Sequence, residues 1–152
     1  MIKPEDIKIG DLVRVCCDCA FPNGTLCIVN QVYPSVIDGG KTGIVDLLCV
    51  DGTTDHIVRG VWCVNVEGIP LTPEILKKND FNTMVPGRYT QSMGDTSRVL
   101  KRYISIECRD SGWAVFLKYD SLPDHVLIRK IQYVHELQHI LWALGLNAEL
   151  KV

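Results

Sequence analysis

Short apolar runs alternate with turn residues through the first half of the chain. Runs rich in Val, Ile and Leu, separated by Gly, Asn and Asp, are typical of short β-strands joined by tight turns. On this pattern we expect five strands, at residues 9–15, 25–33, 43–50, 55–58 and 61–66. Consecutive short strands of this kind favour a small sheet that curls strongly or closes into a barrel.

A short helix follows these strands and has the clearest local signals in the chain. Thr72 is a good N-cap residue, Pro73 suits the first helical position, and Glu74 lies in the first turn. Asn79 is expected to end the helix in a left-handed conformation. Residues 82–97 are polar, contain Pro-Gly and Gly-Asp pairs, and are predicted to form a loop.

The last third of the chain combines strands with one long helix. Residues 99–108 and 113–119 predict a hairpin, and residues 125–129 predict a further strand. The long helix is predicted at residues 131–144, where apolar side chains recur at helical spacing on one side. These side chains belong to Ile131, Val134, Leu137, Leu141 and Leu144.

Two residues of the long helix have expected structural roles. Gln138 falls inside the apolar stripe and therefore needs buried hydrogen-bond partners, which we expect to be backbone groups at a sheet edge. Gly145 is a suitable residue just beyond the helix end, where Leu146 can fold back on Leu141.

Together the expected elements predict an α+β fold. It consists of a small SH3-like β-barrel or curled antiparallel sheet, a short capped helix, a hairpin and a packed C-terminal helix. We expect residues 1–152 to form a single domain, since this length is enough for one ordinary core. The alternative is a division into a barrel-like part at 1–80 and a hairpin-plus-helix part at 81–152.

Composition favours an intracellular globular protein. Apolar residues make up 47% of the chain and charged residues 22%, which are ordinary values for a folded domain. The apolar stretches are too short to span a membrane, and the polar residues 1–6 do not open a signal peptide. The chain has seven cysteines, and an odd number cannot complete a disulfide framework, so we expect reduced thiols and a cytoplasmic protein.

Charge disfavours nucleic acid as the partner. The net charge is −2, and neither half of the chain has the basic excess that non-specific binding to phosphate backbones requires. A nucleic-acid-binding barrel therefore remains an alternative hypothesis only.

One segment matches a catalytic motif. His135-Glu136-Leu137-Gln138-His139 fits H-E-x-x-H, in which two histidines one turn apart bind zinc and the glutamate activates the metal-bound water. A catalytic zinc also needs a third protein ligand, and positions 142 and 145, where one such pattern continues with Gly and His, hold Trp and Gly. Upstream ligands such as His125 or Cys108 stay open, but we expect no metal, no cofactor and no catalytic residue.

A second pattern of metal-ligand type is weaker. Cys16-Cys17-Asp18-Cys19 contains C-x-x-C, but no second such pair follows, and in a strand Cys16 and Cys19 would point to opposite faces. We interpret these cysteines as structural and leave open whether they bind metal.

Two longer segments resemble small uncharacterised proteins of gut bacterial genomes and their prophages. Residues 68–81, Gly-Ile-Pro-Leu-Thr-Pro-Glu-Ile-Leu-Lys-Lys-Asn-Asp-Phe, and residues 133–139, Tyr-Val-His-Glu-Leu-Gln-His, carry the resemblance. Such proteins often have Gln at the position of Glu136 and Gly at the position of Asp80. The resemblance implies a phage or mobile-element setting in a bacterial host cell, and it implies no activity.

The sequence thus favours a non-enzymatic interaction or accessory protein that modulates its host or sequesters a small ligand. A zinc-dependent hydrolase using His135, Glu136 and His139 is the alternative. A protein partner or self-association is expected, since the apolar stripe of the long helix is wider than one sheet face covers. We expect Trp142, Ile131, His135 and His139 to form that surface, and Thr72, Pro73, Gln138 and Gly145 to have structural roles.

Overall fold

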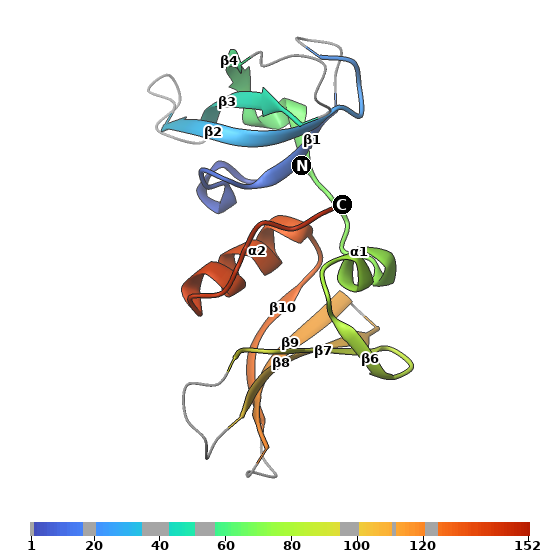
Figure 1. The fold of residues 1–152 in the computed structure, drawn as a ribbon. Helices are drawn as coiled ribbons and strands as arrows, with labels where there is room; N and C mark the ends of the chain where they lie inside the picture. The colour runs from blue at the N-terminus through green and yellow to red at the C-terminus, as the bar shows by residue number, and fades with distance from the viewer. Residues whose placement is uncertain are drawn as a thin grey trace. The chain divides into compact units, whose positions relative to one another are not determined.

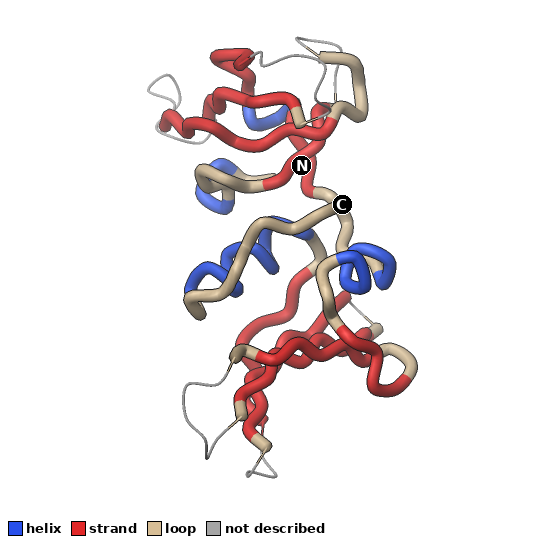
Figure 2. Tube along the Cα trace, in the orientation of Figure 1, coloured by secondary structure: helices blue, strands red, loops and turns tan. Residues whose placement is uncertain are grey.

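The protein consists of two compact units, Met1–Ile69 and Pro70–Val152, each built on one five-stranded antiparallel sheet (Figure 1). The computed structural model describes residues 2–16, 21–34, 43–50, 57–94, 101–110, 112–120 and 125–152. The boundary after Ile69 places the short helix with the second sheet. Strands dominate both units and helices are few (Figure 2), so the expected α+β class is confirmed.

The first unit contains five strands, and the first three match the predicted strands closely. The five strands are β1 (Leu12–Val15), β2 (Leu26–Pro34), β3 (Gly43–Cys49), β4 (Ile57–Trp62) and β5 (Val66–Gly68), with 3-10 turns η1 (Pro4–Asp6) and η2 (Cys63–Asn65). They pair in the order β4-β3-β2-β1-β5. The single strand predicted at 61–66 is wrong, because β4 continues to Trp62 and the turn η2 separates it from β5.

Alternate positions of these strands form the core of the first unit. Successive strand residues point to opposite faces, and one face is fully buried. Its side chains include Val13, Val15, Cys27, Val29, Val45, Leu47 and Val66. Register shifts at Val29/Gln31 and Val45/Leu47 bend β2 and β3.

The second unit contains two helices and one five-stranded sheet, whose strands pair in the order β10-β9-β8-β7-β6. Its elements are α1 (Pro73–Lys78), β6 (Asn82–Val85), β7 (Arg88–Ser92), β8 (Arg102–Arg109), β9 (Gly112–Tyr119), β10 (His125–Ile131) and α2 (Val134–Ala143). Both helices lie on one side of the sheet (Figure 1). The core includes Ile104, Ile106 and Val115 of the sheet and Leu137 and Leu141 of α2, all fully buried.

The loop predicted at 82–97 is wrong. Residues 82–92 form the hairpin β6–β7, which turns at Pro86-Gly87 with Gly87 at a φ of 77°. β6 lies at the sheet edge with all four side chains exposed, so it has no apolar alternation to reveal it. Residues 95–97 lie outside the described residues.

The long helix starts later than predicted. The chain is still extended at Ile131, the last residue of β10, and the backbone NH of Leu71 donates to the carbonyl of Gln132. This pairing holds residues 131–133 out of the helix, which begins at Val134. Its end is as predicted: Gly145 has a φ of 70°, and the NH of Leu146 donates to the carbonyl of Leu141 over 2.9 Å.

The structural residues are placed largely as expected. Thr72 caps α1 by accepting from the backbone NH of Ile75 over 3.3 Å, and Pro73 is the first helical residue. The prediction for Asn79 is wrong, because the left-handed residue is Asp80, at a φ of 61°. Gln138 is buried as expected, and it donates to the backbone carbonyl of Ala148 in the segment after the helix over 3.1 Å.

Candidate functional site

The two histidines of the H-E-x-x-H segment lie side by side on α2, as their spacing predicts. Their ring centroids are 5.8 Å apart, and the ring of Tyr133 stacks on that of His135. His135 is buried, with only 2% of its surface exposed, so it is not the surface residue that the sequence led us to expect.

Glu136 caps the start of its own helix. Its Oε2 accepts hydrogen bonds from the backbone NH groups of Gln132, over 2.7 Å, and Tyr133, over 3.0 Å. These are groups that a helix start leaves without partners, and a carboxylate there also interacts favourably with the helix dipole. The carboxylate that a hydrolase would use as its base therefore has a structural function here.

The upstream ligand candidates do not join these residues in a metal site. Among the described residues, no three His, Cys, Asp or Glu side chains are grouped to hold a metal ion. The ring of His125 packs edge-on against Phe116 of β9, with centroids 4.9 Å apart, and Cys108 is exposed on β8. Of the C-x-x-C segment, only Cys16 lies within the described residues, and the five described cysteines are not joined in disulfides.

The predicted interaction residues are only partly at the surface. Trp142 is 73% exposed, and His139 is partly exposed. Ile131 is 1% exposed, because it ends a strand instead of beginning the helix. The prediction that Ile131 is an exposed contact residue is therefore wrong.

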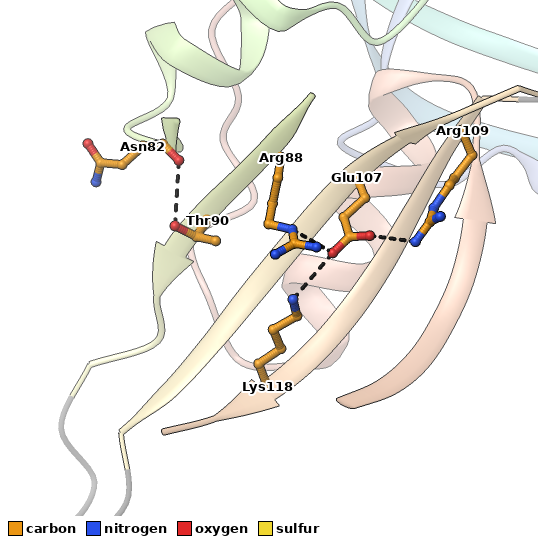
Figure 3. Close-up of polar contacts among 6 residues, drawn as sticks. All are labelled: Asn82, Arg88, Thr90, Glu107, Arg109 and Lys118. Carbon is orange, nitrogen blue, oxygen red and sulfur yellow. Dashed lines mark hydrogen bonds and ion pairs between the residues drawn. The ribbon is translucent and has the colours of Figure 1, made fainter. Parts of the chain in front are cut away.

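A charged cluster that the sequence did not reveal lies on the second sheet. The side chain of Glu107, on β8, is only 7% exposed and is surrounded by three cations from three strands (Figure 3). Its Oε1 lies 2.8 Å from Nε of Arg88 and 3.3 Å from Nζ of Lys118. Its Oε2 lies 2.6 Å from Nη2 of Arg109.

Strand register places this cluster on the face opposite the buried core. Arg88 lies directly across from Glu107 on β7, while Ile104 and Ile106 alternate with Ser105 and Glu107 along β8. We call this surface the Glu107 face; it includes Arg88, Thr90, Tyr103, Ser105, Glu107, Arg109, Ala114, Phe116, Lys118, Leu127 and Lys130.

The Glu107 face is locally positive. Burial raises the pKa of Glu107, but the hydrogen bond from Lys118 and the charges of Arg88, Lys118 and Arg109 outweigh it, so the pKa is lowered overall. Glu107 is therefore ionised at neutral pH. Three positive charges around one negative charge leave an excess of two.

An aromatic residue borders the cluster. The guanidinium of Arg109 lies 6.0 Å from the ring centroid of Phe116. Leu127 of β10 lies directly across from Phe116 and is half exposed. The cations of the face thus lie on β7, β8 and β9, and half-exposed Leu127 of β10 adds an apolar side chain at its border.

Sequence reasoning missed the cluster because its members are far apart along the chain. The alternation Ser105-Ile106-Glu107 within β8 shows that one face of that strand is polar. No local sequence pattern indicates that Arg88 and Lys118 contact Glu107, because the contact follows from the pairing of three strands.

Neither described helix has the length and apolar run that a membrane span needs. Comparisons of the chain with protein-family models, with curated proteins and with solved structures gave no match.

Proposed function

We propose that the protein is a non-enzymatic binding protein that holds an anionic group of its ligand on the Glu107 face. The observation that carries the proposal is the convergence of Arg88, Arg109 and Lys118 on one buried carboxylate. Cations brought this close repel one another, and a single carboxylate offsets only part of that repulsion. An anionic ligand would complete the charge balance.

The arrangement also leaves donors for a ligand. A guanidinium has five N–H donors and an ammonium three, and each cation here forms one ion pair with Glu107. The side chains of Arg88 and Arg109 are 43% and 55% exposed, so their remaining N–H groups face water. Glu107 holds the charged groups of these three side chains in place before a ligand binds, which lowers the entropy cost of binding.

A titration with sulfate tests this proposal. Sodium sulfate, added at constant ionic strength against sodium chloride, should saturably shift the arginine Nε resonances of Arg88 and Arg109 in NMR spectra. Arg109→Gln should weaken the sulfate response at least fivefold. Lys77→Gln, which removes an exposed cation from α1, is the matched control and should leave it unchanged. Shifts that do not saturate, or that Arg109→Gln leaves intact, would contradict the proposal.

For the first unit we propose an SH3-like barrel. The strand order β4-β3-β2-β1-β5, the short 3-10 turn between β4 and β5, and the register shifts that bend β2 and β3 support it. A role for this barrel in binding nucleic acid is disfavoured, because residues 1–69 hold more acidic than basic side chains.

The biological setting is proposed from the sequence resemblance. We propose a phage or mobile-element accessory protein in the cytoplasm of a bacterial host, acting by sequestering a ligand or contacting a protein. The zinc-hydrolase alternative is less well supported, because Glu136 already holds two backbone NH groups of its own helix.

A further inference from the structure

We infer that the anionic group recognised by the Glu107 face is the terminal phosphate of a small phosphomonoester. The inference rests on the proposed function and narrows it to one class of ligand. It uses the charge of the cluster, the placement of its donors, a buried hydroxyl and the apolar border of the face.

Charge selects a dianion. Arg88, Arg109 and Lys118 with Glu107 carry a net charge of two positive units, and a ligand group with two negative charges restores neutrality. A phosphomonoester has a second pKa of about 6 and is mostly dianionic above neutral pH. A carboxylate has one charge, and so has each phosphodiester of a nucleic acid or a diester lipid. The cluster therefore matches a terminal phosphate better than these groups.

The donors also fit a tetrahedral group. Arg88 and Lys118 approach the same oxygen of Glu107, and Arg109 approaches the other, so the three heads surround one small region. A phosphate presents three terminal oxygens, which suits three cationic donors from different directions.

A buried hydroxyl gives a second, independent indication. Ser105 is fully buried on the Glu107 face, and its Oγ has no hydrogen-bond partner among the described residues. Lys118 lies directly across from Tyr103, four positions before Glu107, so its stem must run past Ser105 to reach that carboxylate. If a bound anion moved the Lys118 ammonium away from Glu107, the Lys118 side chain would uncover the hydroxyl of Ser105. That hydroxyl could then donate a hydrogen bond to the anion. Buried polar groups without partners are rare and call for such an explanation.

The border of the face indicates a ligand with an apolar or planar body. Phe116 lies beneath Arg109 and is only 8% exposed, so half-exposed Leu127 of β10 supplies the apolar surface at this border. A small molecule suits this better than a polyanion, because the whole chain carries a net charge of −2 and would repel an extended row of phosphates.

The test compares two ligands of the same shape and different charge. Phenyl phosphate is a dianion at pH 7.5 and phenyl sulfate a monoanion, and their binding to the full chain is measured by calorimetry. We expect phenyl phosphate to bind at least tenfold more tightly. Arg109→Gln and Lys118→Gln should each abolish most of this preference, and Lys77→Gln should retain it.

Glu107→Gln separates a binding role from a structural one. Removing the carboxylate raises the local charge by one unit but also releases the three cations that Glu107 holds in place, so phenyl phosphate should bind at least threefold more weakly than to the wild type. Melting curves establish whether Glu107→Gln is folded. If it is not, Glu107→Asp, which keeps the charge, is used in its place. With Glu107→Asp, affinity within threefold of the wild type is expected, and loss of binding overturns the inference.

The remaining outcomes distinguish the two proposals. If both esters bind equally and saturably, anion binding stands and the phosphate inference is wrong. If neither ester nor sulfate binds, both are wrong. If a phosphotyrosine peptide binds more than tenfold more tightly than phenyl phosphate, the ligand is a phosphorylated protein, and the small-molecule assignment is overturned.

Discussion

Three carboxylates are buried among the described residues, and their partners differ in kind. Asp11 accepts from the backbone NH of Lys8, and Asp46 accepts from the backbone NH of Gly60 and the hydroxyl of Tyr33. The two donors to Asp46 are neutral groups of the fold. Glu107 instead has three cations, more than its charge requires. That contrast between single residues is why we assign a binding function to Glu107 and a structural one to Asp46.

The lowered pKa of Glu107 predicts how stability depends on pH. Because the folded-state pKa lies below the ordinary value of 4.5, the stabilisation is complete above pH 4.5 and is lost as pH falls through the folded-state value. At pH 7, Glu107→Gln should lower the free energy of unfolding by about 1–3 kcal/mol. Urea unfolding of both proteins from pH 7 to pH 3 measures it, and a stability difference that persists undiminished at pH 3 would contradict the assignment.

At the scale of elements, the two helices depend on single residues at their ends. α1 has only six residues and is held by Thr72 at its start and by the side chain of Asn79 at its end. The Asn79 amide donates to the carbonyls of Ile75 and Lys151 and accepts from the backbone NH of Lys151, all over 2.8 Å. The polar residue that ends the helix thus also attaches the last residues of the chain to α1.

Substitutions at the two ends of α1 should change stability in opposite directions. Thr72→Ala removes the N-cap and should cost about 1 kcal/mol. Asp80→Gly relieves a non-glycine residue at a φ of 61° and should stabilise by up to about 1 kcal/mol. Thermal unfolding of both variants and the wild type is the measurement. An unchanged melting temperature for Thr72→Ala would show that the cap contributes nothing.

For the whole molecule, Trp142 is the most exposed large apolar side chain among the described residues, at 73%. An exposed tryptophan offers a large apolar contact area with one polar N–H group, which is why tryptophan is enriched at interfaces. The prediction that two copies associate through Trp142 stays a prediction. The burial of Ile131 and His135 removes two of the residues first expected to support that surface.

Substituting Trp142 tests association without disturbing the core. We expect the wild type to self-associate as its concentration rises, and Trp142→Glu to remain monomeric with an unchanged melting temperature. Sedimentation velocity across a concentration series measures both proteins. His139→Ala is a second variant on the same helix. If the wild type is monomeric at the highest concentration, Trp142 is not a contact between copies.

Local sequence determined most of the strands and helix ends of this protein. Thr72-Pro73 and Gly145 fix helix ends because capping depends on hydrogen bonds and backbone angles within a few residues. The apolar runs of β1, β2 and β3 likewise predict strands from local sequence, because one face of each strand is buried.

Tertiary structure decided the hairpin β6–β7, the start of α2 and the candidate site. The exposed edge strand β6 has no apolar alternation, and Ile131 fits a helix until the pairing of Gln132 with Leu71 holds the chain extended. Glu107 meets Arg88 and Lys118 only through the register of β7, β8 and β9. Register between strands is set by side chains distant in sequence, so no local pattern contains it.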